Sequence, residues 1–253
     1  MGHRVIDVLV RERRLRWPIP PGFETQIRHQ TVRRVERRAK YILITLDAGT
    51  LILHLGMSGS LRVLAGGVAP RTHDHWDIVL DSGSVLRFHD PRRFGSVHFT
   101  ESDPSDHPLL ARLAPEPLSE EFDADYLHRA TRKRKVAIKH LIMNSSMVVG
   151  VGNIYASEAL FRAGVSPRRA ARRLTRIQAQ ALTRAIKEVL TEAIEIGGTT
   201  LRDYVNAEGI PGYFRQRLFV YERAGEPCRV CKKPVKQFVQ GQRSTYWCPT
   251  CQR

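Results

Sequence analysis

The sequence predicts a multidomain α+β protein, with an N-terminal β-sandwich, a helical middle part and a small C-terminal cysteine hairpin. Three observations support this order. Strand-like apolar runs fill the first hundred residues, helical periodicity begins after a stretch rich in Pro, Asp and Glu, and all four cysteines lie in the last 26 residues. With 253 residues and 42% hydrophobic content, the chain is long enough for one large domain or two moderate ones plus the hairpin.

The first hundred residues are rich in short apolar runs separated by turn residues. Val5–Val10 is one such run. In two places a run leads through a four-residue turn into the next run: Tyr41–Leu46 into Leu51–His54, and Asp77–Leu80 into Val85–Phe88. This half is therefore expected to be a β-sandwich or a flattened barrel.

The composition changes between Glu101 and Glu121, where Pro and acidic residues indicate a linker. The clearest helix beyond it is expected to begin after Thr175 as N-cap and to end at Gly197, in the position of a left-handed C-cap. Its apolar positions at helical spacing are Ile177, Ala181, Leu182, Ala185, Val189, Ala193 and Ile194.

The cysteines form two CxxC pairs, Cys228 with Cys231 and Cys248 with Cys251, separated by sixteen residues. The alternative is a pair of disulfides, but a disulfide scaffold usually distributes its cysteines through the chain. The spacing instead favours a zinc ribbon in which four thiolates surround one Zn²⁺. Four protein ligands leave no open position for water, so this Zn²⁺ is expected to be structural.

The chain is strongly basic, with 41 Lys and Arg residues against 25 Asp and Glu residues, a net charge of +16 and a pI near 10.4. An excess of this size favours a polyanionic partner, and nucleic acid is the first candidate. A membrane surface is the rival partner, but no apolar run approaches the roughly 20 residues of a spanning helix.

A glycine-containing turn, Val149–Gly152, precedes Asn153 and a helical pattern that continues to Phe161. Backbone amides at a helix start, with glycines that allow close approach, make an anion site that suits a phosphate. A plain turn between helices explains the same residues without a ligand, because glycine tolerates many backbone conformations.

In combination, these motifs resemble bacterial formamidopyrimidine-DNA glycosylases along essentially the whole chain. The segments that carry the resemblance, in order, are Arg37–Tyr41, His54–Ser60, His73–His75, Asp90–Gly95, Gly150–Glu158, Gly197–Thr200 and the cysteine ribbon.

The resemblance implies a bifunctional base-excision-repair enzyme. Such enzymes remove oxidised purines, notably 8-oxoguanine and formamidopyrimidines, from double-stranded DNA and then cut the abasic site by β,δ-elimination. The implied domains are a β-sandwich over residues 1–113, a helix-two-turn-helix domain over 114–221 and a zinc finger over 222–253. A cytoplasmic, nucleoid-associated monomer with one structural Zn²⁺ is expected.

Two catalytic and three duplex-inserting residues follow from the same resemblance. Lys40 corresponds to the lysine credited with proton transfer in β-elimination, and Arg243 to the finger arginine assigned to δ-elimination. Met57, Arg92 and Phe94 correspond to residues that fill the space left by the flipped base. Without the resemblance, Met57 and Phe94 would be interpreted as core residues.

Three further positions correspond to DNA-contacting residues of the family: His73, Arg134 and Asn153. The basic run around Arg134 fits a solvated charged surface almost as well. His73 and His75 have the spacing of a possible metal pair, which we reject because no further ligands accompany them. Residues Asn206–Phe214 resemble the family's loop over the flipped base, and a simple connection fits them equally.

The resemblance departs from the family at the front of the chain. Family members carry a Pro-Glu-Leu-Pro-Glu-like segment whose terminal proline is the nucleophile, whereas this sequence starts Met1-Gly2-His3-Arg4. We expect a start site set too far downstream; the alternative is a nucleophile-lacking zinc-finger protein that binds damaged DNA without cutting it. Without that segment's helix, apolar sandwich surface is expected to be uncovered.

Overall fold

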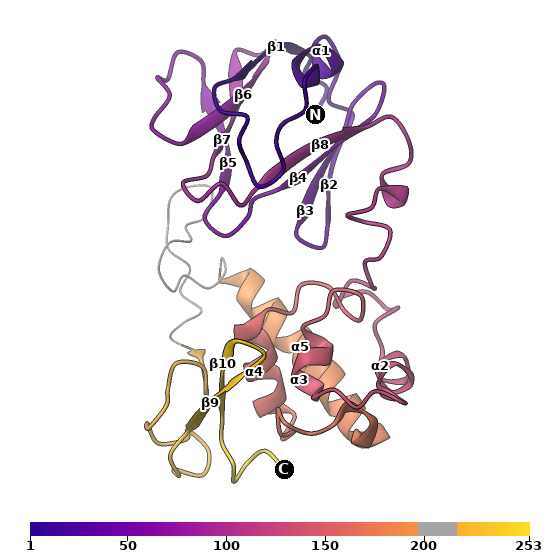
Figure 1. Cartoon of the computed structure of the whole chain (residues 1–253), viewed down its shortest axis with the longest axis vertical. Coiled ribbons are helices and arrows are strands. Elements are labelled where there is room, and N and C mark those ends of the chain that lie inside the picture. The colour runs from indigo at the N-terminus through magenta and orange to yellow at the C-terminus, as the bar shows by residue number, and fades with distance from the viewer. Residues whose placement is uncertain (197–216) are drawn as a thin grey trace. The chain divides into compact units, whose positions relative to one another are not determined.

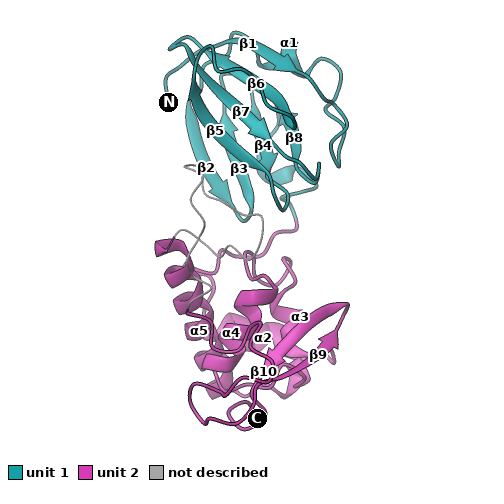
Figure 2. Ribbon diagram, turned by 90° about the vertical axis from the view of Figure 1, so that its left-hand side faces the viewer, with its two compact units in different colours: residues 1–111, 202–211 teal, residues 112–201, 212–253 magenta. Residues whose placement is uncertain are grey.

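The computed structural model describes residues 1–196 and 217–253, which form two compact units (Figures 1 and 2). Among the described residues, unit 1 is Met1–Ala111 and unit 2 begins at Arg112. Three sequence predictions, the Gly197 C-cap, the Gly197–Thr200 motif and the loop Asn206–Phe214, lie outside the described residues. The predicted order of strands, helices and C-terminal hairpin is confirmed.

Unit 1 contains two four-stranded antiparallel sheets, in the orders β1-β6-β7-β5 and β2-β3-β4-β8. A short helix, α1 (Phe23–Ile27), follows β1 and packs Phe23 and Ile27 into the core. The strand bounds are β1 Val5–Val10, β2 Arg34–Arg38, β3 Tyr41–Thr45, β4 Thr50–His54, β5 Ser60–Ala65, β6 Asp74–Leu80, β7 Ser84–His89 and β8 Ser96–Thr100.

The core of unit 1 lies between the sheets, because each sheet directs alternate apolar residues toward the other. Trp76 on β6 and Phe88 on β7 stack with ring centroids 5.2 Å apart, and Leu51 and Leu53 approach from β4. The unit is therefore the sandwich that the alternation predicts.

The predicted turn between β3 and β4 forms with the Leu46 N–H donating to the Gly49 carbonyl at 2.7 Å. A glycine is required there because a Cβ on residue 49 would lie 2.4 Å from the Thr100 carbonyl oxygen of the neighbouring strand β8.

An apolar cavity of about 360 Å³ remains in unit 1. Its lining comes from both sheets and includes Val35, Ile42, Leu55, Val63 and Leu86. Val35 and Val63 are 51% and 69% exposed, so the expected uncovered apolar surface is present on the sandwich.

Unit 2 combines helices with a two-stranded ribbon. The helix bounds are α2 Ala124–Thr131, α3 Ile138–Ile142, α4 Asn153–Arg162 and α5 Arg176–Glu195, and the strands are β9 Lys236–Gln240 and β10 Arg243–Trp247. The Asp123 carboxylate caps α2 by accepting the Tyr126 N–H at 2.6 Å. Within the described part of the chain, no helix has both the length and the apolar character needed to cross a membrane.

Helix α5 begins as predicted, with Thr175 as N-cap in a capping box with Gln178. Leu182, Val189 and other predicted apolar positions are buried. The prediction was wrong for the first and last positions, since Ile177 is 79% and Ile194 63% exposed. Neighbouring positions near both ends, Ala179 and Ala193, are buried, so Ile177 and Ile194 lie on the face of α5 that does not pack in the core.

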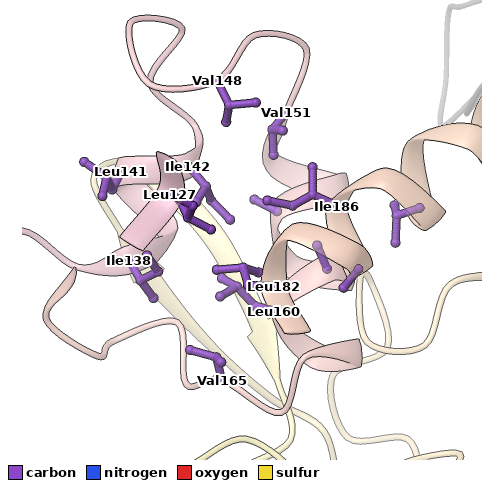
Figure 3. Close-up of a cluster of buried hydrophobic side chains, with 14 of the residues drawn as sticks. Leu127, Ile138, Leu141, Ile142, Val148, Val151, Leu160, Val165, Leu182 and Ile186 are labelled. Carbon is purple, nitrogen blue, oxygen red and sulfur yellow. The ribbon is translucent and has the colours of Figure 1, made fainter. Parts of the chain in front are cut away.

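The helices of unit 2 enclose a second core (Figure 3). Leu127 of α2, Ile138 of α3, Leu160 of α4 and Leu182 of α5 meet there, all almost fully buried. A smaller apolar cluster joins the ribbon to the helices through Phe161 of α4.

One buried carboxylate fixes the start of the ribbon segment against α4. Glu158 is fully buried, and its two oxygens accept the N–H groups of Phe219, Val220 and Tyr221 at 2.7, 2.9 and 2.9 Å. Burial raises the pKa of Glu158, and these three hydrogen bonds oppose the rise.

Candidate functional site

The four cysteines converge as a closed metal-binding cluster. Their sulfur atoms all lie within 4.8 Å of one another, with Cys228 to Cys251 at 3.9 Å and Cys231 to Cys248 at 3.4 Å. A disulfide requires about 2.05 Å between sulfur atoms, so the four residues are free thiols. Four thiol ligands in one cluster fit a single structural Zn²⁺, which would hold the two CxxC turns together.

Each CxxC turn is supported by its own hydrogen bonds. The Cys228 N–H donates to the Lys233 carbonyl at 2.8 Å, and the Cys248 N–H donates to Gln252 Oε1 at 2.8 Å. Gln252 is buried and donates through Nε2 to the Val165 carbonyl at 3.0 Å. The cysteine cluster is thereby attached to the helical part of unit 2.

Arg243 lies at the first position of β10, immediately after the turn of the ribbon, and is exposed. The turn residues Gly241 and Gln242 both have positive φ, at 57° and 60°. The ribbon therefore presents a cation at its tip, on a hairpin whose far end is held by the cysteine cluster.

Asn153 is joined to this hairpin through a buried lysine. Lys139 Nζ donates to Asn153 Oδ1 at 2.7 Å and to Thr245 Oγ1 at 2.7 Å, and Asn153 Nδ2 donates to the Ser244 carbonyl at 3.0 Å. Burial first, and then the charge of Arg243, lower the pKa of Lys139 to about 8. Sequence reasoning missed Lys139, because a lysine near a basic run gives no signal of burial.

The structure thus places Asn153 and the residues that follow Arg243 in one network. Arg134 is not part of it: the residue is exposed after α2, and its carbonyl accepts the Arg172 N–H at 2.9 Å. Lys133 beside it has φ 64°, so the basic run changes direction there.

Lys40 lies in unit 1, in the tight turn between β2 and β3, and is exposed. Ala39 in the same turn has φ 54°, and the Arg37 guanidinium donates to its carbonyl at 2.8 Å. His54 is a neighbour of this turn, with its ring 5.2 Å from that of Tyr41. Burial, followed by the charges of Lys40 and Arg16, lowers the pKa of His54 to about 4, so its imidazole is neutral near pH 7.

Met57 and Phe94 are exposed, at 64% and 40%, so their interpretation as core residues is wrong. Their two loops touch, because a Cβ on Gly56 would lie 2.8 Å from the Gly95 nitrogen and the Phe94 carbonyl carbon. The Arg92 guanidinium lies 4.9 Å from the centroid of the Phe94 ring. Two apolar side chains and a cation are therefore held at the surface on adjacent loops.

Asp90 connects these two loops from beneath. It is fully buried, accepts the Gly95 N–H at 2.7 Å and the Ser58 hydroxyl at 3.3 Å, and its carbonyl lies 2.7 Å from His75 Nε2. The residue belongs to the Asp90–Gly95 motif, but the sequence alone gives no indication that its carboxylate joins two loops.

His73 is exposed with φ 73°, in the loop before β6. Its ring centroid lies 6.4 Å from that of His75 and 6.2 Å from that of His89. His75 is buried against Asp90, so the two histidines of this pair have different surroundings.

Three family models match successive parts of the chain. The formamidopyrimidine-DNA glycosylase N-terminal domain matches residues 1–97, the formamidopyrimidine-DNA glycosylase H2TH domain matches 113–205, and the zinc finger found in FPG and IleRS matches 225–253. Together these models match the strand-rich, helical and cysteine-containing parts of the chain.

Curated relatives are similar over the full length of the chain. The formamidopyrimidine-DNA glycosylase of Thioalkalivibrio sulfidiphilus is 61% identical over 252 residues, and that of Methylococcus capsulatus is 54% identical over 252 residues. Each alignment covers 100% of this chain and 93% of the relative.

Solved structures show the same architecture. The MutM (Fpg) protein of Thermus thermophilus is 40% identical, with a TM-score of 0.87, over 100% of this chain and 92% of that protein. The Fpg of Lactococcus lactis in complex with DNA containing an abasic site is 30% identical, with a TM-score of 0.88, over 100% and 93%.

Proposed function

Because this chain belongs to the formamidopyrimidine-DNA glycosylase family, we propose that it is a base-excision-repair enzyme for oxidised purines in double-stranded DNA. The single observation that carries this proposal is the 61% identity to a curated glycosylase along the entire chain. Its substrates are 8-oxoguanine and formamidopyrimidines, and its reaction is base removal followed by AP lyase cleavage through β,δ-elimination. The net charge of +16 suits the DNA partner.

Within this activity, Lys40 and Arg243 take the catalytic roles. Lys40 is exposed in a tight turn, and the His54 beside it is neutral. The Lys40 side chain can therefore exchange a proton with the sugar of the flipped nucleotide. Arg243 stands at the tip of the ribbon, where a guanidinium can hold the phosphates beside the lesion.

The DNA contacts are made by Met57, His73, Arg92 and Phe94 of unit 1 and by Arg134 and Asn153 of unit 2. Met57 and Phe94 supply apolar surface for the space that the extruded base leaves, and Arg92 supplies donors for the orphaned partner base. Extrusion costs a few kcal/mol, which these contacts offset in part.

The remaining proposals concern organisation. The domains run over residues 1–113, 114–221 and 222–253, and the protein acts as a monomer in the cytoplasm, associated with the nucleoid where its substrate lies. One Zn²⁺ orders the ribbon through Cys228, Cys231, Cys248 and Cys251.

The test is base release and strand cleavage on a duplex with one 8-oxoguanine. Two proteins are compared: the 253-residue chain, and the same chain preceded by the family's Pro-Glu segment. We expect the extended protein to release the base and to form a borohydride-trapped adduct, because a terminal amine with a pKa near 8 is partly neutral at pH 7.

The 253-residue chain is expected to bind the lesion duplex without forming this adduct. Efficient trapping by that chain would mean that another amine, that of Met1 or of an internal lysine such as Lys40, is the nucleophile. No base release by either protein, with zinc bound and the fold intact, would contradict the proposed activity.

A further inference from the structure

A small pocket of about 70 Å³ lies on unit 1, away from the apolar core, and both polar and apolar side chains line it. Its polar lining comes from Arg62 of β5, Arg87 and His89 of β7, and Arg71 and Asp74 around the loop before β6. Arg62 and Arg87 are directly paired in the β5–β7 register. Because one buried water needs roughly 10–15 Å³ of this kind of volume, the pocket has room for a group larger than a single water.

The acidic groups near the pocket already have partners within unit 1. Arg87 is bidentate to Asp77, at 2.9 and 2.8 Å, and is buried. Asp74 accepts the Arg71 backbone N–H at 2.7 Å, and its other oxygen lies 2.8 Å from His89 Nδ1. Asp74 Oδ2 also lies 3.6 Å from Arg87 Nη1, and among the described residues neither carboxylate forms an ion pair with Arg62 or Arg71.

Two arginines of the lining therefore have no acidic partner among the described residues. In the ranges 1–196 and 217–253, Arg62 and Arg71 form no ion pair, and the buried Arg62 Nε has no hydrogen-bond acceptor. A buried donor without an acceptor costs free energy unless a ligand or water satisfies it. A guanidinium donor beside a second arginine suits the non-bridging oxygens of a phosphate.

We propose that this pocket binds a phosphate group, and that the phosphate belongs to the DNA backbone next to the one held by His73. The inference rests on the proposed function for its substrate. His89, which lines the pocket, has its ring 6.2 Å from that of His73, and Arg71 is two residues before His73 on the same loop. The Asp74 carboxylate holds that loop, so both contacts are presented together.

The experiment measures binding of the lesion duplex against salt concentration for Arg62→Gln, Arg71→Gln and a control, Arg34→Gln. Arg34 has the same charge but lies on β2 of the other sheet, in an exposed pair with Glu36. Loss of one phosphate contact is expected to reduce the slope of log K against log salt by about 0.9. The affinity of each pocket variant should fall roughly tenfold, while the control keeps the wild-type slope.

A second measurement locates the phosphate. Uncharged methylphosphonate is placed at one backbone position of the duplex at a time. One position is expected to weaken binding by the wild type but not by Arg62→Gln or Arg71→Gln. Equal slopes for all three variants, with no such position and no stabilisation of the wild type by inorganic phosphate, would overturn the proposal.

Inorganic phosphate separates the two possible sources of the ligand. A rise in the unfolding temperature of the wild type, absent in Arg71→Gln, with equal DNA slopes for all variants, would support the anion pocket and overturn its assignment to DNA. Base release from the 8-oxoguanine duplex is scored separately. A salt slope that changes in the pocket variants, without base release, would refute the repair activity but still support phosphate binding in the pocket.

Discussion

Asp90 holds the two loops that carry the duplex-inserting residues of unit 1. Its carboxylate has no solvent exposure, and it joins Ser58, next to Met57, to Gly95, next to Phe94. A change at this buried position therefore moves two exposed side chains that it does not touch.

Replacement of Asp90 by Ala is expected to lower the free energy of unfolding by about 1–3 kcal/mol, because the buried Gly95 N–H loses its acceptor. Urea unfolding measures this change. Affinity for the lesion duplex should fall by more than the loss of folded protein explains, since the Met57 and Phe94 loops separate. Asp81→Ala, in an exposed pair with His3, is the control; equal effects of the two changes would contradict this role.

His54 gives a pH dependence with a defined sign. Its pKa is about 4 in the folded protein, against an ordinary value near 6.5, so between these values the unfolded chain binds more protons. Stability is therefore expected to be lost as pH falls from about 6.5 toward 4. Burial also lowers the pKa of His98, which adds to the same loss.

The His54→Asn variant should flatten this dependence in part, because His98 still contributes. Urea midpoints measured across the window from about pH 7 to pH 4 test the expectation. A midpoint that falls equally in the variant and the wild type would exclude His54 as a source.

At the scale of elements, the ribbon and α4 share one hydrogen-bond network. Lys139 of α3 contacts Asn153 at the start of α4 and Thr245 of β10. The cysteine cluster at the other end of the ribbon holds the same hairpin. A mutation in the metal site and a mutation in the hydrogen-bond network should therefore weaken the same DNA contact.

Lys139→Met is expected to lower DNA affinity about tenfold or more while zinc content stays at one per chain, because the contacts that join Asn153 to the ribbon are lost and the cysteines are untouched. Cys248→Ser should lose both zinc and lesion-specific binding. Zinc content and lesion binding are measured for each, with Thr250→Ser as the control within the same CxxC turn. Lesion-specific binding that survives without zinc would refute the role of the ribbon.

The elements that could be predicted from sequence are those fixed by local chemistry. The Thr175 N-cap and the CxxC pairs depend on neighbouring residues, and both form as expected. What sequence could not supply depends on distant partners. Asp90 and Lys139 gain their importance from burial by other elements, and Met57 and Phe94 have core-like side chains that the loops hold outward.

At the scale of the whole molecule, charge governs the encounter with DNA. A chain with a net charge of +16 should bind duplex with a log-log salt slope of about −0.9 for each phosphate that it neutralises. Fluorescence anisotropy over a range of salt concentrations measures this slope. A flat salt response would be incompatible with binding through the backbone phosphates.

The three N–H groups that Glu158 accepts give the molecule a fixed reference point. Phe219, Val220 and Tyr221 are aligned on α4 itself, so the start of the ribbon segment takes its position from that helix. The helix that begins with Asn153 thus also sets the position from which the metal-binding end of the molecule starts.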